Sequence, residues 1–514
     1  MAAPNEKLAA ALESLKALQD DGRVAIRSRD LTRTTRELLL KRGFLQPVIK
    51  GWYVPAMPEG NPGETTAWYM AFWAFSRDYL EDRFGADWSL TAEQSLILHA
   101  GALTVPRQLL VRAPRANNQS TGLLHDTSIF ESALALPGDD ERARLDGLRL
   151  YSAAAALVTV PASFFETHPT EARTVLSIQP DASAVLVHLL RGGHSTVAGR
   201  LTGAFRNIGR DREADAILAG MTAANHTVRE VDPFTDQRPR IPYRRDPSPY
   251  VQRLRLMWER MREDVMGRLP AEREQANDIE AYLREVDALY ATDAYHSLSI
   301  EGYRVSLELI ERVRSGQWNP QANTADRDLE AGLAASGYWQ AFQLVRNSVR
   351  DVLAGQHPGD VADRDHPAWY REMFTPKIAA GLLKPENLAG YRNGPVYLRG
   401  SRHVPLNADA VRDAMPAFFD LLREETDPAA RIVLGHFIYV YIHPYFDGNG
   451  RTGRFLMNVM MAAAGYPWTV IPVEERDRYM TALEAASVGQ DIRPFADFIA
   501  DCIRHASDVR TPGR

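Results

Sequence analysis

Residues 443–454, HPYFDGNGRTGR, place one histidine, one aspartate and two arginines close together around two glycines. The apolar run Ile432–Ile442 before this stretch is long enough for a buried helix, and Pro444 prevents that helix from continuing. Helical spacing of apolar residues resumes after Arg451. This order predicts a helix, a glycine-rich loop and a second helix, whose free N-terminal N–H groups and positive dipole end would bind an anion in the loop.

The charged side chains of this stretch indicate what kind of anion it binds. Arg451 and Arg454 are three residues apart and project from one face of the first helical turn, where guanidinium groups grip phosphate oxygens. Asp447 would repel phosphate unless it held Mg²⁺, which bridges carboxylate and phosphate oxygens. His443 is the only group here that accepts a proton near neutral pH, as a general base must. These residues therefore predict a metal–polyphosphate site for phosphoryl or nucleotidyl transfer.

The stretch resembles the core motif of the Fic family, HxFx(D/E)GNGRxxR, with Tyr445 in place of the usual phenylalanine. We expect Tyr445 still to wedge the loop against the core. The resemblance covers about residues 250–514 and implies a mainly α-helical Fic domain. It implies a protein adenylyltransferase, which transfers AMP from Mg-ATP to a Ser, Thr or Tyr hydroxyl of a protein target. In this comparison His443 is the general base and Asp447 is the metal ligand.

The resemblance also implies which residues hold the nucleotide. Those in the motif bind its phosphates, with Arg454 on the γ-phosphate, and two downstream residues line the adenine pocket. The two downstream residues fit equally well as core residues on a helix face. The implied nucleotide-binding residues are Gly448, Asn449, Gly450, Arg451, Arg454, Tyr479 and Leu483.

A second, shorter pattern precedes this core. The string SLSIEG fits the family's inhibitory pattern (S/T)xxxE(G/N), with Ser297, Glu301 and Gly302 in place. The resemblance implies an inhibitory helix near 290–302, whose Glu301 pairs with Arg454 and displaces the γ-phosphate from it. The alternative is an ordinary surface glutamate that ends a helix before a C-cap glycine.

The segment 391–406 contains two short strand-like stretches around the polar residues 399–402 and predicts a β-hairpin. It matches the family's flap, which lays the protein target alongside it by strand addition. The residues of this target-docking flap are Val396, Tyr397, Leu398, His403 and Val404. His436 is seven residues before His443, on the same face of the predicted helix. We expect it to be a buried histidine with satisfied hydrogen bonds and not a catalytic partner.

The composition is that of a folded protein without a membrane segment. The 514 residues are 45% hydrophobic and 25% charged, and the net charge of −6 gives no chain-wide reason to expect nucleic acid as a partner. Cys502 is the only cysteine, so an intramolecular disulfide is excluded. Neither a signal peptide nor an apolar run of membrane-spanning length is present, so we expect a cytoplasmic protein of two to four domains.

The first 60 residues differ in pattern from the rest. A helix, a capped helix from Thr32 and two strands joined at Lys50–Gly51 follow one another in winged-helix order. This segment resembles the N-terminal winged helix of the AbiE-type antitoxin family, and residues 61–235 resemble the second, α/β domain of that family. The resemblance implies DNA contact through residues 1–60. A helical cap or protein-docking module is the alternative, because a fold does not fix its function.

These features predict a multidomain chain. It has a winged helix over 1–60, an α/β domain over 61–235, a proline-rich boundary at 231–250, and a Fic domain over 250–514 with a short hairpin flap. The function we expect is an autoinhibited protein adenylyltransferase with ATP as substrate and Mg²⁺ as cofactor. Two alternatives are a Fic enzyme that uses another donor or removes AMP, and a DNA-binding regulator whose Fic half senses a nucleotide. The sequence leaves the protein target and homodimerisation open.

Overall fold

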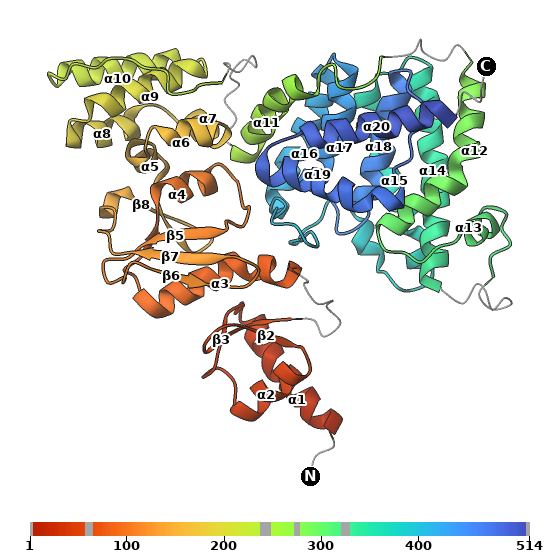
Figure 1. The fold of residues 1–514 in the computed structure, drawn as a ribbon, viewed down its shortest axis with the longest axis horizontal. Helices are drawn as coiled ribbons and strands as arrows, with labels where there is room; N and C mark the ends of the chain where they lie inside the picture. The colour runs from red at the N-terminus through yellow and green to blue at the C-terminus, as the bar shows by residue number, and fades with distance from the viewer. Residues whose placement is uncertain (1–3, 57–64, 237–247, 272–277, 320–328, 510–514) are drawn as a thin grey trace. The chain divides into compact units, whose positions relative to one another are not determined.

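The computed structural model describes residues 4–56, 65–236, 248–271, 278–319 and 329–509. Contacts divide the chain into two compact units (Figure 1). The first is Met1–Arg253 with Tyr397–Val404, and the second is Leu254–Val396 with Pro405–Arg514. The predicted boundary at 231–250 falls largely on residues 237–247, which lie outside the described residues. None of the helices in the described part of the chain is long and apolar enough to cross a bilayer.

The N-terminal segment has the predicted order of helices and strands. The Thr32 hydroxyl accepts a hydrogen bond from the Thr35 N–H (3.2 Å) and so begins the second helix. The strands after it are antiparallel and turn at Lys50–Gly51, where Gly51 has φ 85°. A short strand between the helices completes a sheet of order β1-β3-β2. The elements are α1 (Pro4–Asp20), β1 (Ile26–Arg27), α2 (Arg33–Lys41), β2 (Leu45–Ile49) and β3 (Trp52–Pro55).

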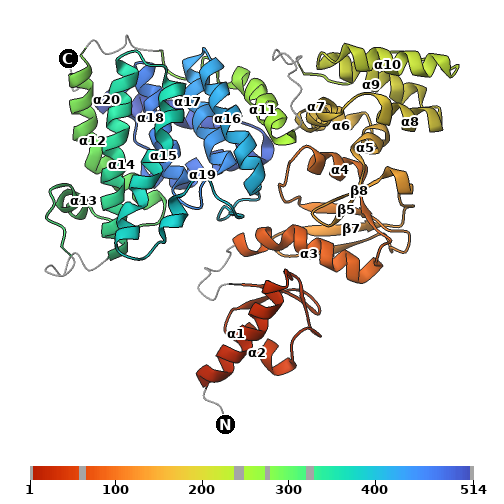
Figure 2. The same ribbon diagram turned by 180° about the vertical axis from the view of Figure 1, so that it is seen from behind.

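The rest of the first unit has a four-stranded sheet of order β4-β5-β7-β6, in which only the β5–β7 pair is parallel. Figures 1 and 2 show this sheet between α3 and α4. A separate β8–β9 hairpin follows, and α4–α10 share a second apolar core. The strands are β4 (Ser89–Leu90), β5 (Gln108–Arg112), β6 (Gln119–Gly122), β7 (Ser128–Ser132), β8 (Arg142–Leu145) and β9 (Leu148–Tyr151). The helices are α3 (Thr66–Phe84), α4 (Ala92–His99), α5 (Ala153–Thr159), α6 (Ser163–Thr167), α7 (Pro169–Ile178), α8 (Ser183–Gly192), α9 (Ser195–Asn207) and α10 (Asp211–Ala223).

The second unit is helical, as the sequence predicts for the Fic half. Its two central helices, α17 and α18, lie between α14 and α16 in both views (Figures 1 and 2). They pack closely because Gly453 faces Val440: a Cβ on this glycine would lie 3.0 Å from Val440 Cγ2. The helices are α11 (Pro249–Val265), α12 (Ile279–Ile300), α13 (Leu307–Arg314), α14 (Leu329–Leu353), α15 (Pro358–Ala379), α16 (Ala408–Glu424), α17 (Pro428–Ile442), α18 (Asn449–Ala463), α19 (Arg476–Gly489) and α20 (Arg493–Val509).

The prediction of a β-hairpin in residues 391–406 was wrong. The segment makes a turn, in which Ser401 N–H donates to the Leu398 carbonyl (3.2 Å), but its flanking residues are not strands. The Arg402 carbonyl accepts instead from the N–H of Val105, within the first unit. Arms this short gain too few cross-strand contacts to hold a ladder on their own. The residues concerned are Val396, Tyr397, Leu398, His403 and Val404.

Candidate active site

His443 ends α17 in a left-handed conformation (φ 55°), which turns the chain toward the glycine-rich loop. Its Nδ1 lies 3.2 Å from the Val440 carbonyl. Because a carbonyl only accepts, Nδ1 carries the proton and Nε2 keeps its lone pair. Burial, aided by the nearby Arg392 cation, lowers the pKa of His443 to about 4. The imidazole is therefore neutral at pH 7 and can accept a proton.

The loop after His443 is held in shape from within. Asn449 Oδ1 accepts from the Tyr445 N–H (2.9 Å) and its Nδ2 donates to the Tyr445 carbonyl (2.8 Å). The Asn449 side chain is thus used by the loop, which leaves its backbone N–H for a phosphate. Tyr445 is buried and stacks on Tyr370 with ring centroids 3.7 Å apart, so the predicted wedge is confirmed. Gly448 has φ 79°, and a Cβ there would lie 2.9 Å from Phe374.

Asp447 is the exposed carboxylate of the loop, with 54% of its side chain accessible. Its Oδ1 accepts from the Gly448 N–H (2.5 Å) and from Arg451 Nη2 (3.1 Å). Desolvation raises the pKa of Asp447, but Arg451, the Gly448 N–H and Lys377 together outweigh it, and the net shift is downward. The carboxylate is therefore ionised at neutral pH, and its contacts within the described part of the chain are made by Oδ1.

The residues around Asp447 fit Mg²⁺ held jointly with a nucleotide. No group of three or more histidine, cysteine or acidic side chains that could hold a metal occurs in the described part of the chain. Mg²⁺ commonly takes one or two protein carboxylates and completes its shell with phosphates and water. A single exposed carboxylate beside two arginines suits that mode of binding.

Arg451 and Arg454 are both buried, on the first and second turns of α18. Arg451 lies between two aromatic rings, 5.3 Å from the Tyr303 centroid and 5.1 Å from that of Phe374. One nitrogen of each guanidinium, Nε of Arg451 and Nη1 of Arg454, is buried without a hydrogen-bond partner in the described structure. Buried donors are nearly always satisfied, so two unsatisfied ones at a helix N-terminus indicate an anion site.

The inhibitory glutamate of the sequence prediction lies at this anion site. Glu301 Oε1 accepts from Arg454 Nη2 at 2.7 Å. A Cβ on Gly450 would lie 2.4 Å from the same oxygen, so the carboxylate rests against the first turn of α18. Ser297 supports the contact from one turn earlier: its hydroxyl accepts from Arg454 Nε (2.9 Å) and its carbonyl from Nη2 (3.0 Å). The predicted pairing of Glu301 with Arg454 is present.

The end of α12 places Glu301 there. Glu301 is the C-cap of the helix, and Gly302 follows with φ 91°, a conformation that glycine adopts without strain. Arg476 Nε donates to the Ile300 carbonyl (2.9 Å), and the Val473 N–H donates to His296 Nδ1 (3.1 Å). Glu301 thus ends a helix before a left-handed glycine, and its carboxylate also reaches Arg454; its inhibitory role stays a prediction.

Three residues at the site were missed by the sequence analysis. Arg392 is buried and donates to the His443 carbonyl (2.7 Å) and to the Gly394 carbonyl (2.9 Å). Tyr303 covers Arg451, and its hydroxyl accepts from Lys377 Nζ (3.1 Å). Only Tyr303 had a usable signal, since it directly follows the inhibitory pattern. Arg392 lies in the segment 391–406, but the flap pattern does not include it, and Lys377 comes from a segment without a motif.

The two residues predicted to contact adenine, Tyr479 and Leu483, differ in how deeply they are buried. Tyr479 is fully buried, and its hydroxyl donates to His436 Nε2 (2.8 Å). It is a core residue in this structure, as the alternative interpretation of the sequence had it. His436 also donates from Nδ1 to the Gly453 carbonyl (3.0 Å), which confirms the expected buried histidine with satisfied hydrogen bonds. Leu483 is half-buried on the same helix, and its contact with adenine stays a prediction.

Comparison with known proteins agrees with this geometry. Residues 368–461 match the model of the Fic/DOC family. The chain is 31% identical over 224 residues to a protein adenylyltransferase Fic of Drosophila willistoni, and 38% identical over 224 residues to that of Drosophila erecta. Each match covers 43% of this chain and 41% of the relative, so the chain spans about two-fifths of the length of the curated relatives it matches.

Solved structures of Fic proteins also resemble the chain. Fic-1 (residues 134–508) of C. elegans is 20% identical with a TM-score of 0.36, and the match covers 63% of this chain and 92% of Fic-1. A Fic-domain-containing signalling protein of Bacteroides thetaiotaomicron is 16% identical with a TM-score of 0.35, covering 51% of this chain and 95% of the other. The family match over residues 368–461 confirms the resemblance inferred from the motif: this chain contains a domain of the Fic/DOC family.

Proposed function

We propose that this chain is a protein adenylyltransferase that Glu301 holds in an inhibited state. The observation that carries the proposal is the position of the Glu301 carboxylate, 2.7 Å from Arg454 and against Gly450 at the N-terminus of α18. A carboxylate there occupies the place where the resemblance puts the γ-phosphate of ATP. When Glu301 leaves, the unsatisfied donors of Arg451 and Arg454 become available to the polyphosphate.

The chemistry follows from the loop. The Nε2 lone pair of His443 takes the proton of a target hydroxyl, whose oxygen then attacks the α-phosphorus. An O–P bond forms, the bond from the α-phosphorus to the bridging oxygen breaks, and pyrophosphate leaves with that oxygen. Mg²⁺ held by Asp447 would neutralise charge on the phosphates. The N–H groups of Asn449 and Gly450 and the two arginines hold the phosphates in line.

Tyr303 adds a second inhibitory contact. Its ring lies over Arg451, and its hydroxyl accepts from Lys377, so it occupies two cations beside Asp447 while Glu301 occupies Arg454. Both residues belong to the segment that follows α12. Release of the site would require both contacts to break.

The target would dock along 396–404. This segment matches the flap of the Fic family in position, and the resemblance implies that its backbone pairs with a target by strand addition. The Ser401–Leu398 turn keeps the segment compact. In the proposed reaction a Ser, Thr or Tyr of the target presents its hydroxyl to His443.

The test uses the full chain with Glu301→Gly, incubated with Mg²⁺ and ATP labelled at either the α- or the γ-phosphate. We expect label on protein from α-labelled ATP alone, and none in the Glu301→Gly/His443→Ala double variant. Label from γ-labelled ATP would mean phosphoryl transfer and contradict the proposal. If neither form labels protein, UTP and CDP-choline test other donors. Loss of label from a premodified protein would indicate AMP removal.

A second candidate function is DNA binding by the N-terminal segment. It is favoured by exposed cations on α2 and at the following turn, namely Arg33, Lys41, Arg42 and Lys50. If these residues contact DNA phosphates, binding of the full chain to duplex DNA should weaken steeply with salt, with a log–log slope of about −0.9 per phosphate contacted. Charge reversal at Lys41 and Arg42 should reduce that slope. Absence of binding at low salt would leave protein docking as the role of this segment.

A further inference from the structure

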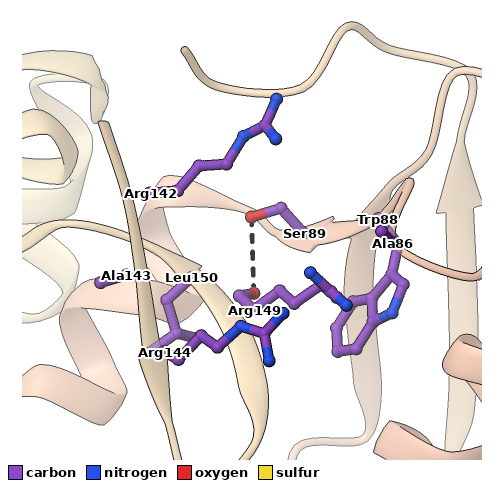
Figure 3. Close-up of a pocket in the computed structure, with 8 residues that line it drawn as sticks. All are labelled: Ala86, Trp88, Ser89, Arg142, Ala143, Arg144, Arg149 and Leu150. Atoms are coloured by element: carbon purple, nitrogen blue, oxygen red, sulfur yellow. Dashed lines mark hydrogen bonds between the residues drawn. The ribbon is translucent and has the colours of Figure 1, made fainter. Parts of the chain in front are cut away.

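A pocket of about 340 Å³ lies in the first unit, beside the β8–β9 hairpin (Figure 3). The Ser89 hydroxyl donates to the Arg149 carbonyl (3.4 Å) and so links β4 to the hairpin within the pocket. Three of the lining residues are arginines. The lining residues are Ala86, Trp88, Ser89, Arg142, Ala143, Arg144, Arg149 and Leu150.

The β8–β9 hairpin places two of these arginines, Arg144 and Arg149, directly opposite each other across its strands. Figure 3 shows both side chains among those that line the pocket. Like charges in this position destabilise a hairpin. They cannot slip apart, because the turn between Leu145 and Leu148 uses Asp146 (φ 49°) and Gly147 (φ 80°), the two-residue turn that fixes strand register.

The nearby carboxylates neutralise this charge only in part. Arg149 makes a two-pronged ion pair with Glu81, through Nε (2.8 Å) and Nη2 (3.3 Å). Arg142 lies 3.1 Å from Asp139, whose side chain is 96% exposed, so that pair is weak. The side chain of Arg144, an exposed residue, makes no ion pair or hydrogen bond among the residues that the structure describes. The pocket thus keeps an excess of positive charge where the two strands are locked together.

We propose that this pocket binds the phosphate group of a small organic phosphate of mononucleotide size. Adjacent guanidinium groups offer parallel N–H donors that match phosphate oxygens, and a phosphate between Arg144 and Arg149 would relieve their repulsion. The volume lies in the range of small-molecule sites, roughly 300–1,000 Å³, and exceeds what an inorganic anion alone would fill. This site is separate from His443 and does not depend on the proposed function.

The test measures how fast one residue, Arg144, is chemically modified in the full chain. Arginines are modified with phenylglyoxal, with and without AMP, and the rate at Arg144 is followed by peptide mass spectrometry. With AMP at ten times its Kd, modification of Arg144 should slow about tenfold, in proportion to occupancy. Arg115, which is 67% exposed and lines no part of the pocket, serves as the control and should keep its rate.

Three outcomes would overturn the inference. The first is an unchanged rate at Arg144 with saturating AMP. The second is protection by duplex DNA but not by AMP, which would make this a nucleic-acid surface. The third is protection that disappears in Arg454→Ala, because AMP would then act from the Fic site. Protection that survives Arg454→Ala and is lost in Arg149→Ala supports the pocket.

Discussion

His443 shows how a single side chain is prepared for its proposed role. Its Nδ1 is committed to the Val440 carbonyl, which leaves Nε2 as the only nitrogen that can accept a proton. Burial lowers its pKa to about 4, so protonation does not compete at neutral pH. A histidine with a lower pKa is a weaker base. In the proposed mechanism the arginines and the helix N-terminus compensate by stabilising negative charge on the phosphates.

This pKa predicts the pH dependence of transfer. A base must be deprotonated to act, so the contribution of His443 should be complete above about pH 5 and lost only as pH falls through about 4. We expect the rate of AMP transfer by Glu301→Gly at saturating Mg-ATP to stay level from pH 8 to 6. Removing Glu301 takes away a charge that raises this pKa, so the shift is further downward. An acid limb near 6.5, the ordinary value for histidine, would contradict the account.

Arg392 is the residue on which we expect the loop to depend most. It donates to the backbone carbonyl of His443 from a buried position, so its loss leaves several carbonyls without a partner. Arg392→Met should lower the free energy of unfolding of the Fic unit by roughly 3 kcal/mol. It should also reduce transfer in the Glu301→Gly background.

The measurements are the melting temperature and the transfer rate, with Arg493→Met as the control. Arg493 is 55% exposed and pairs with Asp491 at the surface, so its replacement should change neither quantity measurably. A wild-type melting temperature and transfer rate for Arg392→Met would show that the clamp on His443 is dispensable.

At the scale of elements, the segment that follows α12 forms the proposed inhibitory device. Glu301 and Tyr303 flank a left-handed glycine and contact different arginines of α18. Tyr303→Leu removes the aromatic face over Arg451 and the acceptor for Lys377, and should raise self-labelling from ATP severalfold, though less than Glu301→Gly. Tyr303→Phe keeps the aromatic face and should stay close to wild type, because a cation–π contact contributes about 0.5–2 kcal/mol.

The two tyrosine variants separate this contact from the proposed function as a whole. If Glu301→Gly labels protein and Tyr303→Leu behaves as wild type, the transferase stands and the second contact does not. If Tyr303→Phe is as active as Tyr303→Leu, the hydroxyl bond to Lys377 carries the inhibition and the ring does not.

Elements with strong local signals were predictable from the sequence. The apolar run 432–442 became α17, the Thr32 cap began α2, and the Lys50–Gly51 turn joined two strands. The hairpin at 396–404 failed because its arms were too short to form a ladder, and the Arg402 carbonyl found a partner elsewhere in the first unit.

Within the site, the motif predicted the residues but not all of their contacts. Helix spacing and the resemblance correctly predicted the contact between Arg454 and Glu301. They did not predict that the Asn449 side chain would hydrogen-bond within the loop, or that the Tyr479 hydroxyl would hydrogen-bond to His436. Arg392 could not be found, since its contacts join segments about fifty residues apart and arginine alone carries no pattern.

At the scale of the whole molecule, the chain joins a Fic unit to a unit of different architecture. The second unit contains every residue of the proposed transferase chemistry. The first unit contains the basic N-terminal segment, the arginine-lined pocket and Tyr397–Val404. The first unit therefore includes most of the predicted flap. It would also bind a nucleotide-sized ligand in that pocket, or DNA on the N-terminal segment.

The central claim is that one carboxylate restrains AMP transfer, and three forms of the full chain test it directly: wild type, Glu301→Gly and Glu301→Gln. Each is incubated with Mg²⁺ and α-labelled ATP, and label on protein is measured over time. Because the Arg454 contact is an ion pair, removing the charge should release the site even when the shape is kept. The account predicts weak labelling of wild type, strong labelling of Glu301→Gly and substantial labelling of Glu301→Gln. Equal labelling of all three forms would contradict it.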